Sequence, residues 1–258
     1  MLKEWKGLWR YRAIVQILIA RELKVRYRGT VLGFLWSLLT PLVFMSVYVL
    51  VFSLFLRIEM EHYPAFLLCG LLPWMLFTTS VTEASRAIID NGTLAKKGGF
   101  PVEILPLVVI GSNLIHFLLT VPLLVIVFMV LGVKLSWTAL LLPGVLLIQL
   151  IFTFGIALLC SSLAVLFRDL LHIVPNALLI WFFLTPVLYP ANMVPQNYRG
   201  FLLFNPMAHL IQAYHQVFFY HEVPSLLPIA LLVTAAIAAA CVGQFVMGNK
   251  RDYLIEAI

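Results

Sequence analysis

The sequence predicts an all-α protein that crosses a membrane six times, with both termini in the cytoplasm. The chain of 258 residues is 63% hydrophobic and 11% charged, whereas about a quarter of the residues of a soluble protein are charged. Six stretches are apolar over roughly the 20 residues that a helix needs to cross a bilayer. These stretches are approximately residues 33–56, 63–81, 104–131, 138–167, 173–189 and 226–247.

The distribution of basic residues predicts the orientation of these six spans. Of the 17 lysine and arginine residues, all but three fall in the N-terminal stretch, the second and fourth connections and the C-terminal tail. The three exceptions are Arg57, Lys134 and Arg199. Cytoplasmic loops carry the excess of lysine and arginine, so both termini are expected inside. The same bias accounts for the net charge of +6, and we do not expect a nucleic-acid partner.

Residues 1–32 form a segment distinct from the single transmembrane domain expected over residues 33–258. Arg21, Lys24 and Arg28 share one face of a helix, while Ile19 and Tyr27 lie on another. This pattern is typical of an amphipathic helix that lies in the membrane interface with its basic face toward lipid phosphates. The alternative is a cytoplasmic tail whose charges only set the orientation.

Residues 201–220 are apolar enough to suggest a seventh span. However, Asn205, His209, Gln212, His215 and Gln216 are too many uncompensated polar groups for a helix that faces lipid. A seventh span would also place the C-terminus outside. We therefore expect residues 190–224, between the fifth and sixth spans, to form an external element made of short re-entrant or interfacial helices.

Several kinds of chemistry are disfavoured by residues that the sequence lacks. All eleven acidic residues are expected in loops, tails or helix ends, whereas ion-coupled transporters usually place a carboxylate at mid-membrane depth. No His-Glu-x-x-His, Gly-x-Ser-x-Gly or phosphate-loop motif occurs. His116 is the best lone candidate for catalysis, although a hydrogen bond to a neighbouring helix is the more common role. Without a phosphate loop, any ATP-driven step needs a partner.

Three blocks of sequence, together spanning most of the chain, carry a family resemblance. They are residues 21–36 followed by Pro41, residues 94–106, and residues 166–207. In this order and spacing they resemble the permease subunits of ABC-2-type polysaccharide exporters, which move O-antigen, capsule and teichoic acid chains across the bacterial cytoplasmic (inner) membrane. His215 stands where that family often has arginine, and Thr40 where glutamine is common. These departures leave the identity of the polymer open.

The resemblance implies the partners and the energy source. Two separate ATPase subunits would bind ATP and magnesium, and this chain would carry no cofactor. The cytoplasmic loop between the second and third spans would hold a coupling helix that docks into them. The candidate docking residues are Gly98, Gly99, Phe100, Pro101, Val102 and Glu103. The residues agree with such a loop, because the glycines break the chain, Pro101 permits a helix start and Glu103 suits a helix N-terminus. A bare cytoplasmic turn is the alternative.

Aromatic residues suit a path for sugars, since rings hold sugar faces weakly and repeatedly. The candidate channel lining is Trp36, Tyr48, Phe52, Trp181, Phe182, Phe183 and Tyr189. The candidate external gate is Tyr198, Phe201, Phe204, Tyr214, Phe218, Phe219 and Tyr220. Ordinary packing is the alternative for each ring taken alone. Six spans are too few to enclose a wide conduit, so we expect a homodimer.

Exported polymers of this family ride on a polyprenyl pyrophosphate carrier, which the N-terminal segment is placed to meet. Arg21, Lys24, Arg26 and Arg28 would bind the pyrophosphate, or simply attract anionic membrane lipids. Three rival functions remain: an ABC-2 permease for a drug or small lipid, a membrane enzyme that acts on lipid-linked sugars through His116 or Asp169, and a passive channel.

Overall fold

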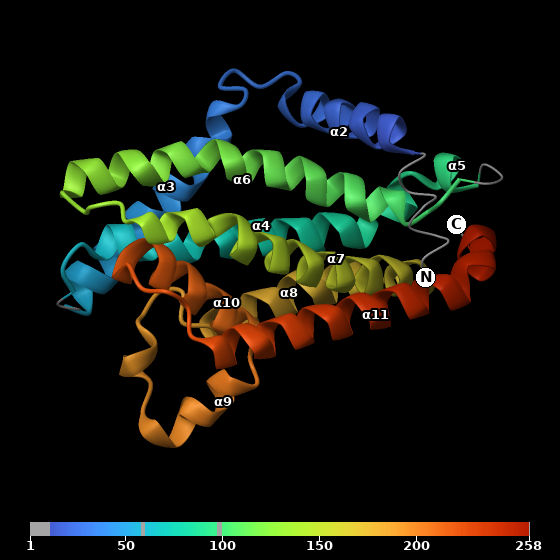
Figure 1. Ribbon diagram of the computed structural model, residues 1–258. Helices are drawn as coiled ribbons and strands as arrows, with labels where there is room; N and C mark the ends of the chain where they lie inside the picture. The colour runs from blue at the N-terminus through green and yellow to red at the C-terminus, as the bar shows by residue number, and fades with distance from the viewer. Residues whose placement is uncertain (1–10, 58–59, 97–99, 258) are drawn as a thin grey trace.

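The structure is a computed structural model that describes residues 11–57, 60–96 and 100–257, with side chains up to Asn249. Within these residues the chain is helical and contains no strand (Figure 1). The long elements are α2 Arg12–Tyr27, α3 Leu35–Val49 with η1 Leu50–Phe55, α4 Tyr63–Asp90, α6 Ile104–Leu131, η2 Trp137–Leu141 with α7 Leu142–Leu166, α8 Leu170–Phe183, and α11 Leu226–Ala257. The short elements are α5 Gly92–Ala95, η3 Ala191–Met193, η4 Gln196–Tyr198, α9 Arg199–Leu203, α10 Pro206–His215 and η5 Gln216–Tyr220.

Five helices of the described residues are long and apolar enough to span a membrane, which confirms an all-α membrane protein. They are Leu35–Phe55, Tyr63–Asp90, Ile104–Leu131, Trp137–Leu166 and Leu226–Asn249. The predicted fifth span, residues 173–189, is instead the 14-residue helix α8, which ends at Phe183. Pro186 explains this early end, because a proline disfavours helical backbone in the residue before it. The six-span topology therefore remains a prediction.

Helix α4 is the central helix of the bundle, and it is longer than predicted. Its most apolar stretch is 78% buried, and it contacts α3, α6, α7, α8 and α10. The sequence predicted a span that ends at residue 81, but α4 continues to Asp90. Glu83, which we expected at a helix end or in a loop, therefore lies seven residues inside a helix.

The closest helix pair is α7 with α11, and glycine makes the approach possible. A Cβ atom added at Gly155 would collide with the backbone of Ala239 and Ala240, and one added at Gly243 would collide with the Gly155 carbonyl oxygen. Small residues at such crossings let helices approach closely in membranes, where packing rather than water exclusion drives association.

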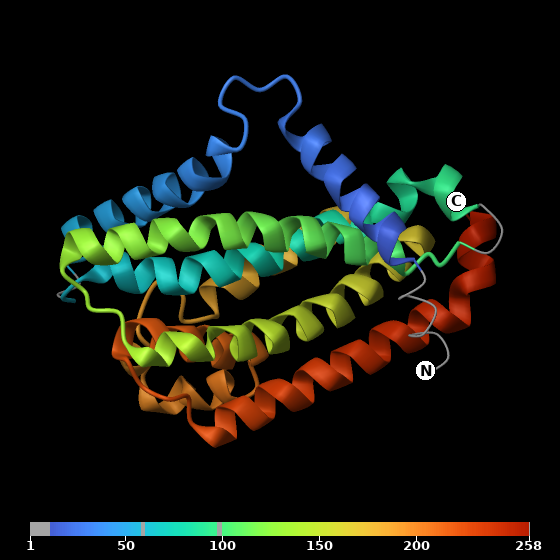
Figure 2. The same cartoon turned by 45° about the horizontal axis from the view of Figure 1, so that its top comes forward.

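The bundle has two ends that differ in what they carry. The start of α2, the short helix α5 and the end of α11 lie together at one end, as both views show (Figures 1 and 2). Arg12, at the start of α2, and Lys96, directly after α5, are two of the basic residues predicted to be cytoplasmic that lie at this end. The α9 segment, which runs from η3 through η4 to α9, extends away from the bundle beside α8 and α10 (Figure 1).

Candidate functional site

An aromatic-lined cavity lies where α8 ends and the chain runs through η4 and α9 into α10. Its volume is about 690 Å³. Three predicted channel residues and three predicted gate residues meet there, although the sequence separates them by up to 23 positions. The lining consists of Trp181, Phe183, Leu184, Tyr189, Val194, Tyr198, Phe201, Leu202, Phe204, Asn205 and Pro206.

The rings of this cavity differ in how firmly they are held. Trp181 packs edge-on against Phe77, with ring centroids 5.5 Å apart, so it belongs to the fixed wall. Tyr198 and Phe201 stack on each other at 6.5 Å, and Phe204 is 89% exposed. One wall is therefore set by the bundle, whereas the other is a set of open rings on the α9 segment.

Asn205 joins the two walls. Its Oδ1 accepts a hydrogen bond from the indole Nε1 of Trp181 at 2.8 Å and from two backbone N–H groups at the start of α10, those of Met207 and Ala208. Its Nδ2 donates to the carbonyl oxygen of Leu184 and to the hydroxyl of Thr185. One side chain thus caps α10 and ties it to the end of α8.

Sequence reasoning did not assign this positioning role to Asn205. The signal was present, because Asn followed by Pro is typical of a helix N-cap with proline at the first helical position. What the sequence did not show is that the capping oxygen also meets Trp181, which lies 24 positions earlier.

The remaining predicted channel residues lie outside this cavity. Tyr48 packs against Phe182 at 5.9 Å, so it ties α3 to α8. Phe52 packs against Tyr63 at 6.4 Å, so it ties η1 to α4. Phe182 is buried. Trp36 lines a different cavity, described below.

The second half of the predicted gate is mostly core. Tyr214 is buried, and its hydroxyl donates a 2.6 Å hydrogen bond to the Gln149 side chain of α7. Phe218 is also buried. Phe219 is half-buried and packs edge-on against Phe66 at 5.5 Å, while Tyr220 remains exposed. Only Tyr198, Phe201 and Phe204 of the seven predicted gate residues line the aromatic cavity.

Helix α2 packs on the bundle through its apolar face and two polar contacts. A Cβ atom at Gly111 of α6 would come within 2.6 Å of Ile19, so α2 lies close to α6. Arg26 forms an ion pair with Glu83 at 2.6 Å and donates to Asn113 at 2.9 Å.

The hydroxyl of Tyr27 lies 2.7 Å from His116 Nδ1. His116 therefore contacts a neighbouring helix, as the structural interpretation of a lone histidine predicts.

A cavity of about 290 Å³ lies beneath the turn between α2 and α3. Arg26, Trp36, Thr40 and His116 are among its lining residues. The other three predicted pyrophosphate ligands, Arg21, Lys24 and Arg28, are exposed and lie along a shallow groove on α2.

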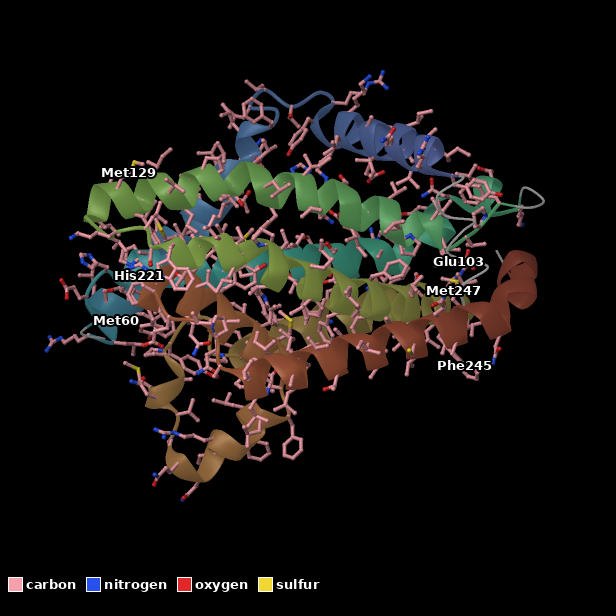
Figure 3. The ribbon with its side chains drawn as sticks, in the orientation of Figure 1. Met60, Glu103, Met129, His221, Phe245 and Met247 are labelled. Carbon is pink, nitrogen blue, oxygen red and sulfur yellow. The ribbon has the colours of Figure 1, made fainter. Side chains whose placement is uncertain are left out.

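The predicted docking loop lies at the end of the bundle that carries α5. Glu103 is the N-cap residue of α6, two positions after Pro101, as predicted for a helix start. Figure 3 places it at the opposite end from Met60, Met129 and His221. Gly98 and Gly99 lie outside the described residues.

Two of the predicted docking residues are turned into the protein. Phe100 and Val102 are buried in a core cluster with Ala95 and Ile104, whereas Thr93 and Lys96 are exposed. The apolar anchor that we predicted at Phe100 is therefore packed inside this chain.

No cluster of three or more potential metal ligands occurs among the described residues. The fold and the site together define a multi-spanning helical membrane protein with an aromatic-lined cavity.

Comparison with known proteins gives the family. Residues 14–219 match the family described as ABC-2 type transporter. The chain belongs to this family of membrane proteins, and the resemblance found in the three sequence blocks is confirmed.

The relatives narrow the comparison further. The chain is 38% identical, over the full length of both proteins, to the O-antigen export system permease protein RfbA of Myxococcus xanthus. It is 35% identical to the protein of the same name from Klebsiella pneumoniae, over 80% of each chain. It is 24% identical to the polysialic acid transport protein KpsM of Escherichia coli, over 78% of this chain and 79% of the relative.

Proposed function

We propose that this chain is the transmembrane subunit of an ATP-driven exporter that moves a lipid-linked, O-antigen-like polysaccharide across the bacterial inner membrane. The observation that carries the proposal is the aromatic cavity at the end of α8, in a chain similar over its whole length to an O-antigen export permease. Sugar hydroxyls are costly to strip of water, whereas aromatic faces hold the C–H faces of sugars without fixing their hydrogen bonds. Such a surface suits a chain that must slide.

Energy would come from two ATPase subunits at the end of the bundle that carries α5. The exposed residues Thr93 and Lys96 are the described contact candidates there, together with the partly exposed Glu103. Because Phe100 is buried, its substitution would disturb the core of this chain and would not report cleanly on docking.

A second copy of the chain would complete the conduit. The span Leu35–Phe55 is only 6% buried in its most apolar stretch, and it is the helix that contributes Tyr48 and Phe52 to the packing against α4 and α8. An outward face on this span suits a two-fold interface.

The carrier pyrophosphate would meet Arg21, Lys24 and Arg28 on the exposed groove of α2. These three side chains are at helical spacing, and guanidinium groups bind phosphate oxygens in pairs. Arg26 would serve the same site indirectly, because its own guanidinium is already paired with Glu83.

The export role is tested by complementing a deletion strain and measuring polymer on the cell surface and inside the cell. The chain should restore surface polymer, and the pair F201A/F204A should lower it several-fold with polymer retained inside. F245A is the matched control, because Phe245 is an exposed phenylalanine on α11 outside the aromatic cavity. Normal export by F201A/F204A, or equal loss in F245A, would contradict a role for the cavity.

The partner assignment has its own test in purified protein. The candidate ATPase subunit should copurify with the chain, and K96E should weaken the complex. K134E changes an exposed lysine at the other end of the bundle and should leave the complex intact. If no ATPase copurifies with the unaltered chain, a passive channel or a membrane enzyme becomes the better interpretation.

A further inference from the structure

A second, polar pocket is lined mainly by residues of the external segment, residues 190–224, and is separate from the aromatic cavity. Its volume is about 290 Å³, and it is bounded by α10, η5, the start of α4 and the connection that follows α8. The polar side chains that line it are Asn192, Gln212, His215, Gln216, Tyr220 and Glu222. We propose that this pocket binds one sugar ring of the exported polymer and so contributes to the choice of polymer. The inference rests on the export function proposed above.

The pocket offers hydrogen-bonding groups that the protein itself does not use. Four lining side chains make no hydrogen bond or ion pair within the described part of the chain. They are the amides of Asn192, Gln212 and Gln216 and the carboxylate of Glu222. Each amide supplies both a donor and an acceptor, and a carboxylate accepts from two hydroxyls at once. Neighbouring hydroxyls on a sugar ring need this combination.

His215, which lines the pocket, adds a ring held in one orientation. Its Nε2 lies 3.1 Å from the carbonyl oxygen of Phe66, and its ring stacks on that of Phe66 with centroids 3.9 Å apart. Since a carbonyl oxygen only accepts, Nε2 carries the proton, and the lone pair of the neutral ring is on Nδ1. Burial lowers the pKa of His215 to about 3, which keeps the ring neutral. Gly70 leaves room for the ring, because a Cβ there would come within 2.9 Å of Nε2.

The frame that holds these groups is locked by backbone contacts. Residues Gln216–Tyr220 form a π-helix. This conformation is rare in proteins, and where it occurs it often lies at a functional site. The N–H of Glu222 closes the turn on the carbonyl oxygen of Gln216 at 2.8 Å, and the Thr138 hydroxyl donates to the carbonyl oxygen of Val217 at 2.7 Å. A backbone frame that is held in advance loses little entropy on binding a ligand.

Size and surface chemistry indicate a single ring. The volume of about 290 Å³ corresponds to roughly ten waters at about 30 Å³ each, which admits one sugar ring but not two. The exposed ring of Tyr220 can stack on one sugar face. The aromatic cavity holds any sugar face, whereas directional amides and a carboxylate distinguish one arrangement of hydroxyls from another. The polar pocket is therefore the one suited to selectivity.

Binding is tested with the full chain in nanodiscs by saturation-transfer NMR. The probes are the methyl glycosides of mannose, galactose, glucose and N-acetylglucosamine, measured one at a time. At least one glycoside should show transfer, and Q212L/Q216L should lower that signal at least several-fold. Q196L is the matched control, because Gln196 is an exposed glutamine of the external segment that does not line the pocket. E222Q should change the ranking of the glycosides rather than abolish all binding.

The Tm and the yield of Q212L/Q216L are measured to distinguish loss of the site from loss of the fold. Both should match those of the unaltered chain. The inference is overturned if no glycoside binds, or if binding survives in Q212L/Q216L or is lost equally in Q196L. Export in the deletion strain is measured in parallel. Surface polymer with no glycoside binding would reject the pocket and keep the export function, whereas glycoside binding without any export of polymer would reject the export function.

Discussion

Replacing Asn205 with alanine should loosen the junction between α8 and α10. The change removes five hydrogen bonds: one from the Trp181 indole, two from the backbone N–H groups of Met207 and Ala208, and two that Asn205 donates to Leu184 and Thr185. Loss of an N-cap costs about 1 kcal/mol. A polar N–H left without a partner costs about 1–3 kcal/mol when buried, and Trp181 is half-buried, so the lower value applies.

The expected total is about 2–3 kcal/mol, which corresponds to a fall in Tm of roughly 5–10 °C for a chain of this length. Thermal unfolding in detergent, followed by tryptophan fluorescence, measures it. N205D is the matched control: its carboxylate still accepts from the two backbone N–H groups and from Trp181, and a negative charge is favourable at a helix N-terminus. N205D should therefore lose less than half as much.

The same variant should also affect transport. Asn205 ties the end of α8, which carries the fixed wall of the aromatic cavity, to α10, which follows the α9 segment in the chain. N205A should therefore lower surface polymer, while N205D should largely preserve it. The reasoning is refuted if N205A unfolds within about 1 °C of the unaltered chain, or if N205D is as damaging as N205A.

Three further predictions follow from other contacts. G155A should lower the yield of folded protein, because the added methyl would meet the backbone of α11 and overpacking costs at least about 1–3 kcal/mol. G144A adds a methyl where nothing lies within 4 Å and should fold normally. The pKa of His215 is about 3 in the folded chain and about 6.5 in the unfolded chain, so the unfolded chain takes up the proton first as the pH falls. The free energy of unfolding should therefore fall by about 2 kcal/mol from pH 7 to pH 5, and H215Q should remove that share of the pH dependence of Tm. R26A should expose α2 to protease, because it breaks the partly exposed ion pair with Glu83, which contributes about 1 kcal/mol or less. R28A changes an exposed residue, and equal cleavage of R28A would contradict the anchoring role of Arg26.

The site was predictable from sequence where the signal is local. Aromatic residues in the stretch after residue 180 predicted a sugar path, and Trp181, Phe183, Tyr189, Tyr198, Phe201 and Phe204 do share one cavity. Glu103 was predicted at a helix N-terminus and is the N-cap of α6. These predictions depend on proline, aromatic content and capping, which a short stretch of residues contains in full.

The site was not predictable where the choice is between burial and exposure. Phe100 and Tyr214 were predicted to face a partner or a polymer, yet both are buried within this chain. Arg26 was grouped with the lipid-facing cations, but it meets Glu83, which lies 57 positions away in the sequence. A single ring or guanidinium has the same local sequence whichever surface it faces.

Hydropathy by itself determined that this is a helical membrane protein and where its long apolar helices lie, because the bilayer imposes length and composition on every span. The basic residues predict which end of the bundle is cytoplasmic. Tertiary structure decided that α8 is short, that α7 and α11 meet through Gly155, and which aromatic rings line a cavity. The physical reason is that a spanning helix is apolar toward lipid and apolar toward its neighbours. Its sequence therefore lacks the polar stripe that marks the outer face of a helix in a soluble protein, and only the packing of the whole chain shows which side is inside.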